Sequence, residues 1–538
     1  MTNLQTIIDQ VVRSQYPQYQ GEVSVVVNRN LEYGDYATPV AFNLSKELGQ
    51  SPAAIAHALV QPFQEAVAGV AVVSVPEGSP FINFRLTEAG YTQLMTQALE
   101  TQNVLIDRAK YTPLRVLIEF ISANPTGPLT LANGRGGFSG DALANCFTFA
   151  GASVEREYYY NDSGNQIMEL GRSVVAARKG EEIEGGYKGP YIQELSKIVT
   201  VEDPYTSGQE SATYIFNHWI KPMIARMGVN FTRYASEQSL IDEGIVDAVV
   251  AMLHTHGLLY DADGALWLRT TDYGDDKDRV MRRTDGTYTY LMKDIAYHWH
   301  KIQRNPTHMF TIVGADHYAE AKTLDMIVRH ILAPAANWNG QFIQPIIQFV
   351  RLMQDGKEVK MSKRAGNFVT IDDLLDEINP DVARFFFLMR DLSSSMDFDL
   401  TLARDASDKN PVYYVQYALV RAKHILESNT ENTSSTLATA DLSTEERQLL
   451  LHLLSFSPLV EEVLETYATH KLPYYAIDLA KHFHAFYAKH PVLKADSIQR
   501  SQRLALTQLT HQSLVHVLHL MGVSQPDRMV RENNETAS

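Results

Sequence analysis

Cysteine is almost absent, with only Cys146 among 538 residues. One thiol cannot form an internal disulfide, and it excludes zinc sites built from several cysteines. Long apolar runs without charge are also missing, and the amino terminus lacks a basic stretch followed by an apolar core. We therefore expect a protein of the reducing cytoplasm that is neither secreted nor inserted in a membrane.

Positive charge is scarce, since 47 Lys and Arg residues face 63 Asp and Glu residues and the formal net charge is −16. This excess argues against a nucleic-acid partner, because phosphate contacts require Lys and Arg. One segment departs from the trend by interleaving cations with aromatic residues: Lys471, Tyr474, Tyr475, Lys481, Phe483, Phe486, Tyr487, Lys489, Lys494, Arg500 and Arg503. Two interpretations remain open, an RNA-binding face and an amphipathic helix whose aromatic side chains are buried.

The most informative segment runs from Arg115 to Asn145. An apolar, β-branched run, Val116 to Ile118, is followed by Asn-Pro and Gly-Pro pairs, then by the glycine run of residues 134–137, then by a helix-like pattern. This order predicts a strand, a glycine-rich loop and a helix. Such a turn presents backbone N–H groups to phosphate, although an ordinary strand-to-helix corner has the same pattern.

A second segment places three cations within five residues, Lys360-Met361-Ser362-Lys363-Arg364. By itself it is typical of a solvated charge cluster. Combined with a nucleotide-type loop, it becomes a candidate clamp on polyphosphate.

These two segments resemble the two signatures of class I aminoacyl-tRNA synthetases. Further stretches resemble the arginyl members, in the same order and over nearly the whole chain. They are residues 33–38, 119–128, 160–166, 274–280, 294–298, 314–317 and 410–418.

The resemblance implies an α/β fold with a Rossmann-type nucleotide-binding catalytic domain. We expect a tRNA-contacting α+β domain over residues 1–108. The catalytic domain would cover 109–390, with an insertion at about 165–265. An all-α helical bundle that binds the anticodon would cover 391–538.

It also implies ATP-dependent ligation of L-arginine to its cognate tRNA through an arginyl-adenylate. The expected partners are tRNA, L-arginine and ATP with Mg²⁺, without zinc and without a membrane. We expect a monomer.

The same resemblance assigns the site residues. Lys360 and Lys363 are the catalytic candidates, and no residue is expected to bind a metal. ATP contacts fall to Thr130, Ala132, Asn133, Gly134, Met361 and Ser362, and arginine contacts to Glu119, Asn124, Tyr290, Asp294 and His317. A guanidinium is a planar fork of donors, so carboxylates suit its recognition.

Each arginine-contact residue also has a purely structural interpretation. Glu119 is then an edge or helix-capping acid, Asp294 a surface acid and His317 a core histidine. Tyr290 and Asp294 are four residues apart and would share one face of a helix.

The first signature departs from the family pattern. The family has His, an apolar residue, Gly, and His or Asn, whereas this chain has Thr130, Leu131, Ala132 and Asn133. Thr and Asn still offer hydrogen-bond donors to phosphate, but no imidazole is present. The alternative function is therefore a catalytically weak or inactive paralogue that binds tRNA or arginine.

Overall fold

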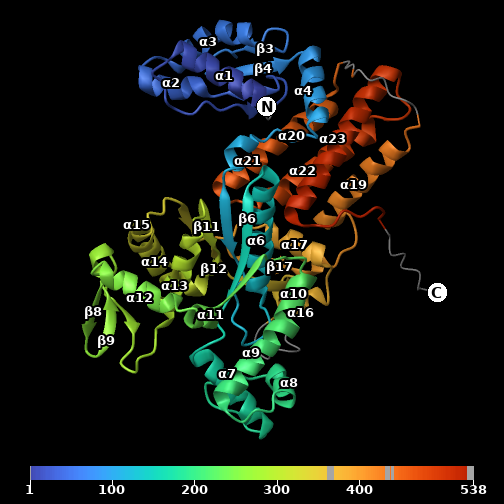
Figure 1. The fold of residues 1–538 in the computed structure, drawn as a ribbon. Coiled ribbons are helices and arrows are strands. Elements are labelled where there is room, and N and C mark those ends of the chain that lie inside the picture. Colours follow the sequence, from blue (N-terminus) through green and yellow to red (C-terminus); the bar gives the residue numbers. More distant parts are fainter. Residues whose placement is uncertain (1, 29, 360–368, 431–436, 438–440, 530–538) are drawn as a thin grey trace, which may run out of the picture.

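The computed structural model describes residues 2–28, 30–359, 369–430, 437 and 441–529. Figure 1 shows three regions: an amino-terminal α/β unit, a central sheet with its helices, and a carboxyl-terminal helical bundle. The amino-terminal unit and the bundle lie on the same side of the central sheet, while α7, α8 and α9 lie at its opposite end.

The central sheet has five strands, and all of its neighbouring pairs are parallel. Their order is β13 (Gln341–Ile343), β11 (His308–Thr311), β5 (Arg115–Glu119), β6 (Ser153–Tyr160) and β7 (Arg233–Ser236). Strands β6 and β7 lie on one side of β5, whereas the later strands β11 and β13 lie on the other side. This confirms the predicted Rossmann-type fold, and the crevice where the order reverses is the usual ligand site of such sheets.

Helix α6 (Leu131–Ala150) follows β5 and corrects one prediction. The run from Gly134 to Gly137 was expected in a loop before the helix, but it lies inside α6. A Cβ on Gly134 would approach Ile371 Cδ1 to 2.6 Å, and one on Gly136 would approach Ile347 Cδ1 equally closely. The glycines therefore allow close packing of the helix, which outweighs their low helix propensity.

The range predicted for an insertion, about 165–265, does not form one inserted unit. Four α-helices connect β6 to β7, and β7 itself belongs to the parallel sheet. They are α7 (Asn165–Arg178), α8 (Pro190–Ile198), α9 (Pro204–Ile215) and α10 (Lys221–Arg226), with the π-helical turn η1 (Phe216–Ile220) between the last two.

A separate antiparallel sheet precedes the second half of the fold. It contains β8 (Leu259–Ala262), β9 (Ala265–Leu268) and β10 (Arg279–Arg282). Helices α11 (Glu237–Asp242) and α12 (Ile245–Thr255) lead into it, and α13 (Tyr290–Gln303) leads from it to β11. Helix α14 (Tyr318–Ile327) and the π-helical turn η4 (Val328–Leu332) follow β11 and the short strand β12 (Val313–Gly314).

Residues 391–538 were predicted to be all helical, which is wrong for one segment. Strand β17 (Met396–Asp399) pairs in parallel with β15 (Val350–Gln354), and β16 (Lys357–Glu358) pairs with the other edge of β15. The alternation of buried and exposed residues in β17 is the strand signal, but four residues are too few to be recognised alone.

The amino-terminal unit consists of the antiparallel sheet β1-β2-β4-β3 covered by helices. The first strand, β1 (Val26–Val27), is short and follows helix α1 (Thr2–Gln15). The other elements are β2 (Tyr36–Thr38), α2 (Val40–Leu48), α3 (Pro52–Ala66), β3 (Ala71–Ser74), β4 (Ile82–Leu86) and α4 (Glu88–Glu100).

The carboxyl-terminal bundle packs long helices against one another, as Figure 1 shows. They are α19 (Pro411–Glu427), α20 (Thr444–Leu454), α21 (Phe456–Thr466), α22 (Lys471–Lys489) and α23 (Ser497–Met521). On α22, the rings of Tyr475, Phe483 and Phe486 are buried, while Tyr474 and Tyr487 are exposed. The aromatic pattern of this segment is thus mostly that of a core-facing helix.

The helices of the described ranges include none with the length and apolar character needed to cross a membrane.

Candidate active site at the reversal point of the sheet

Glu119 is the last residue of β5, at the reversal point of the sheet. It is buried, and it is paired in register with Thr311 on β11. Its Oε2 accepts from Lys301 and from Thr311 Oγ1 at 3.2 Å, and its Oε1 accepts from Ser122 Oγ at 2.9 Å. A carboxylate in this position is fixed by its partners before any ligand arrives.

Lys301 is fully buried on α13 and was not identified from the sequence. Its ammonium donates to Glu119, to Thr311 Oγ1 at 3.0 Å and to His298 Nε2 at 3.4 Å. Burial, reinforced by the charge of Lys301, holds the pKa of His298 well below its usual value. The imidazole is therefore neutral and accepts from the lysine.

Asp294 lies on the same face of α13, seven residues before Lys301, which is about two helical turns. Its carboxylate has no hydrogen bond or ion pair with any residue of the described ranges. Burial, followed by the negative charges of Glu237 and Glu119, raises the pKa of Asp294 well above its usual value. Asp294 is half-buried, so it is not a fully exposed surface acid.

Tyr290 begins α13, so it shares a helix face with Asp294 as predicted. Tyr290 is 45% exposed, and the nearby charge of Asp294 is the main cause that raises the pKa of its phenol. The tyrosine is neutral near pH 7, and its hydroxyl is a donor beside an acidic group.

A second lysine–carboxylate pair lies within electrostatic range of Asp294. Lys293 Nζ is 2.6 Å from Glu237 Oε1, and the Glu237 side chain is fully buried. Ser163 Oγ donates to the same carboxylate at 2.5 Å, and Tyr159 OH donates to its other oxygen at 3.2 Å.

The remaining predicted arginine contacts differ in exposure. Asn124 follows β5. Its side-chain Nδ2 donates to Gln166 Oε1 at 2.7 Å, and its Oδ1 accepts from the backbone N–H of Asn161 at 3.3 Å. His317 ends the short helix η3 (Ala315–His317) after β12, and its side chain is 62% exposed. The structural interpretation of His317 as a core histidine is therefore wrong.

The altered signature forms the start of α6. Thr130 Oγ1 accepts from the backbone N–H of Asn133, and Asn133 Oδ1 accepts from the backbone N–H of Thr130 at 2.9 Å. This capping box explains the two residue types without any ligand. Ala132 is exposed on the first turn, whereas Gly134 is buried against Ile371.

The predicted clamp residues Lys360, Met361, Ser362 and Lys363 lie outside the described residues. Arg135, a cation of the first segment, has a structural role. It is fully buried and donates to the backbone carbonyls of Gln348, Asp391 and Ser394 at 2.6 to 2.9 Å.

The sequence reasoning missed Lys301, Lys293 and Glu237. Lys301 had a usable signal, because it follows Asp294 by two helical turns. Glu237 had no such signal. It belongs to α11, which is separated in the sequence from α13 by α12 and the antiparallel sheet.

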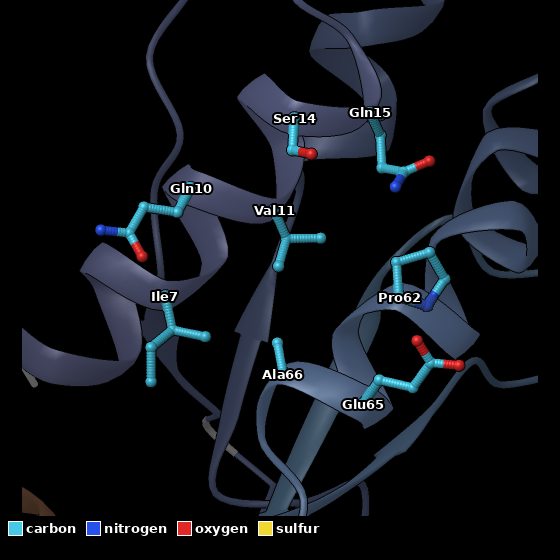
Figure 2. A pocket seen from close by; sticks show the side chains of 8 residues that line it. All are labelled: Ile7, Gln10, Val11, Ser14, Gln15, Pro62, Glu65 and Ala66. Carbon is cyan, nitrogen blue, oxygen red and sulfur yellow. The ribbon is translucent and has the colours of Figure 1, made fainter.

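A pocket of about 370 Å³ lies elsewhere, between α1 and α3 of the amino-terminal unit (Figure 2). Its walls contain none of the predicted site residues. They are Ile7, Gln10, Val11, Ser14, Gln15, Pro62, Glu65 and Ala66.

Three family models match the chain. Residues 2–86 match the arginyl tRNA synthetase N terminal domain, residues 208–385 the catalytic domain of tRNA synthetases class I (R), and residues 415–529 the DALR anticodon binding domain.

Known proteins agree with these models over almost the full length. An arginine–tRNA ligase of Staphylococcus aureus (strain USA300) is 37% identical over 530 residues, which cover 94% of this chain and 95% of the relative. The crystal structure of a putative arginyl tRNA synthetase from Campylobacter jejuni has a TM-score of 0.74 and 30% identity, covering 82% of this chain and all of that one.

The fold is also that of the Thermus thermophilus arginyl-tRNA synthetase, with a TM-score of 0.76 and 22% identity over 98% of this chain and all of that one. The parallel sheet with acids at its reversal point, the three matching models and the 37% identity over 94% of the chain lead to one assignment. The chain belongs to the arginyl-tRNA synthetase family.

Proposed function

We propose that this protein joins L-arginine to its cognate tRNA through an arginyl-adenylate, with ATP as the second substrate. The observation that carries the proposal is the acidic site at the reversal point of the sheet. There, Asp294 lies within electrostatic range of Glu119 and Glu237 and has no ion-pair partner of its own in the described ranges. A half-buried acid without an ion-pair partner favours a cationic ligand.

The arginine side chain would direct its guanidinium to Asp294 and Glu119, with the Tyr290 hydroxyl as a further contact. Asn124 and His317 would hold its amino and carboxylate end. A planar fork can bond two carboxylates at once, which the single ammonium of lysine cannot do in the same geometry.

The first chemical step is attack by the arginine carboxylate on the α-phosphate of ATP. A new carboxylate–phosphate bond forms and pyrophosphate leaves. A ribose hydroxyl at the 3′ end of tRNA then attacks the carbonyl carbon of the adenylate, and AMP leaves. Neither step needs a nucleophilic side chain, so the protein acts by positioning and by stabilising negative charge.

We assign the phosphate contacts to the start of α6, with Thr130, Ala132, Asn133 and Gly134, and to Lys360, Met361, Ser362 and Lys363. A helix amino terminus favours anions, and lysines supply point charges for the β- and γ-phosphates. Mg²⁺ would accompany ATP, held mainly by phosphate oxygens and water, and no zinc is proposed. We assign no residue of this chain as a metal ligand.

Arginine- and tRNA-dependent exchange between ATP and pyrophosphate tests the proposal. The assay must contain tRNA, because members of this family generally need it for arginine activation. Exchange that requires arginine, and that lysine does not support, is expected. A protein that binds arginine and tRNA without exchange would instead be the weak or inactive paralogue considered above, which none of the findings favours.

The charge clamp has its own test. Lys363→Ala should lower the rate of adenylate formation strongly while leaving the dissociation constant of arginine nearly unchanged, because the lysine is assigned to phosphate rather than to arginine. Rapid-quench measurement of adenylate formation and equilibrium arginine binding separate the two effects. An equal loss in both would contradict the assignment.

We further propose that residues 1–108 contact tRNA, that 109–390 form the catalytic domain and that 391–538 form the anticodon-binding domain. On the bundle, Arg421 lies 4.5 Å from the ring centroid of Tyr417 and 4.8 Å from that of Tyr487, on an exposed surface suited to stacked bases. Several cations of the basic segment are engaged by acids, as in the Lys489–Glu445 pair at 2.5 Å. A monomer acting in the cytoplasm completes the proposal.

A further inference from the structure

We propose that Lys301 and Lys293 are positioning residues that act as built-in counter-cations of the arginine site. They pair with Glu119 and Glu237 and leave Asp294 as the carboxylate that receives the guanidinium. This inference rests on the function proposed above. The two lysines would leave the site with one uncompensated negative charge, so that it accepts one ligand cation.

The Lys301 pair is the more deeply buried of the two. The Lys301 side chain is fully buried, and its ammonium has three acceptors, one each from Glu119, Thr311 and His298. The ammonium also lies 4.3 Å from the ring centroid of Tyr297. With its three donors used, Lys301 cannot turn toward another carboxylate.

The Lys293 pair is built independently. Lys293 contacts both Glu237 and Ser163 Oγ, the latter at 3.2 Å, and its side chain is 13% exposed. Both lysines and both of their carboxylate partners act on the pKa of Asp294, so the two pairs lie within electrostatic range of it.

The charges then count as follows. Glu119, Glu237 and Asp294 contribute three negative charges, and Lys301 and Lys293 contribute two positive charges. When Asp294 is ionised, the balance is one negative charge, which a single guanidinium neutralises. Without the lysines, three acids would face one ligand cation at low local dielectric, where uncompensated charge is costly.

Other polar groups around Asp294 do not change this count. Tyr290 and Tyr159 face it from α13 and β6, and both phenols have a raised pKa and are neutral. His298 is neutral, and Glu320 on α14 acts on Tyr290 rather than being among the main influences on Asp294.

The lysine pairs also set the geometry of recognition. Glu119 Oε2 is occupied by Lys301 and Thr311, and Oε1 already accepts from Ser122. A carboxylate oxygen has about two acceptor positions, so Glu119 retains roughly one, at Oε1. Asp294 retains both of its oxygens, so the fork of the guanidinium fits Asp294 and a further N–H fits Glu119.

Calorimetric titration of arginine into the full-length protein, in buffers of different ionisation enthalpy, tests the proposal. The experiment counts protons released per arginine bound. Wild-type protein sets the reference proton count, in which Asp294 releases any proton that it holds before the guanidinium binds. In Lys301→Met, Glu119 is buried without a counter-cation and takes up a proton near neutral pH, so about one further proton should be released.

Arginine affinity at pH 7 should fall about tenfold or more in Lys301→Met, and the loss should shrink as the pH rises. Lys293→Met should also lower arginine affinity, because it leaves Glu237 without its counter-cation. Lys293 is partly exposed, so this variant should disturb folding less than Lys301→Met. Lys110→Met, which breaks an exposed lysine–glutamate pair with Glu465, and Arg503→Met, which breaks a buried pair with Glu446, are the matched controls. Both controls should match wild type in proton count and arginine affinity.

An unchanged proton count in a folded Lys301→Met or Lys293→Met protein would overturn the proposal, as would an affinity loss of the same size at every pH. Unfolding of both variants would also contradict it, because the lysines would then serve the fold. Failure of the proposed function is distinguishable. In that case, wild-type protein shows no arginine-dependent exchange or no preference for arginine over lysine, whatever the variants do.

Discussion

The ionised form of Asp294 lowers the stability of the fold. Its pKa is raised by burial and by two neighbouring acids, so in the folded state it holds a proton that the unfolded chain releases at lower pH. The stability associated with the neutral form is fully present below the unfolded pKa and is lost as pH rises through the raised folded pKa. The same property makes the residue receptive to a cation.

Asp294→Asn should therefore have opposite effects on stability and on function. Its free energy of unfolding at pH 8 should equal or exceed that of wild type, because the amide carries no charge to desolvate. Arginine binding should weaken by about 2 to 5 kcal/mol, the usual loss when one member of a buried charge pair is removed. Denaturant unfolding from pH 5 to 9 and equilibrium arginine binding measure the two effects.

Asp242→Asn provides a control on the neighbouring α11, since this acid is exposed and bonds Gln238 within its own helix. It should change neither quantity. A stability loss in Asp294→Asn that grows with pH would show that the charged form of Asp294 is the stabilising one.

At the scale of elements, two features position α6 against the rest of the catalytic fold. Its amino terminus is held by the capping box of Thr130 and Asn133, and its glycines bring it close to Ile347 and Ile371. Because the cap stabilises the fold, the structural role of Thr130 and Asn133 can be tested by measuring the free energy of unfolding.

Thr130→Ala should lower the free energy of unfolding by about 1 kcal/mol, because the backbone N–H of Asn133 loses its acceptor. Chemical denaturation monitored by circular dichroism measures the change. Thr130→Ser retains the acceptor oxygen and should stay close to wild type.

The triple replacement Thr130→His, Ala132→Gly and Asn133→His restores the family pattern in the same turn. It removes both halves of the capping box, so it should be less stable than Thr130→Ala. If its exchange rate with ATP is not higher than that of wild type, the site has already adapted to Thr and Asn. A stability equal to wild type would contradict the capping role.

At the scale of the whole molecule, the amino-terminal unit is joined to the helical bundle through buried polar contacts. Asp35, fully buried, is paired with Arg447 of α20 at 2.8 Å and also accepts from Tyr91 OH. Asn103 donates to Leu453 O at 2.7 Å and to Ser513 Oγ at 2.9 Å. These contacts fix the amino-terminal unit and the helical bundle relative to each other.

Arg447→Met should destabilise the protein by about 3 to 5 kcal/mol, because Asp35 remains buried without its partner. Arginine binding should remain unchanged, since the acidic site lies in the central sheet. Differential scanning calorimetry and arginine titration measure the two quantities.

The double variant Asp35→Asn with Arg447→Met removes both charges and should recover much of the lost stability. Failure to recover would mean that Arg447 acts through its packing rather than through the ion pair.

Local sequence patterns determined the position of several strands and helices. The apolar run of residues 116–118 predicted β5, and the spacing of Tyr290 and Asp294 predicted one helix face. These predictions succeeded because period and β-branching act within a few residues. Family membership was likewise readable, because the motifs recur in order along the chain.

Tertiary packing decided what no local pattern contains. The glycines after Asn133 lie inside a helix because Ile347 and Ile371 approach from distant segments, and β17 is a strand because β15 lies beside it. The acidic site was decided in the same way. Glu119, Asp294 and Glu237 come from β5, α13 and α11, and their charges interact only because the fold removes them from water and places two lysines among them.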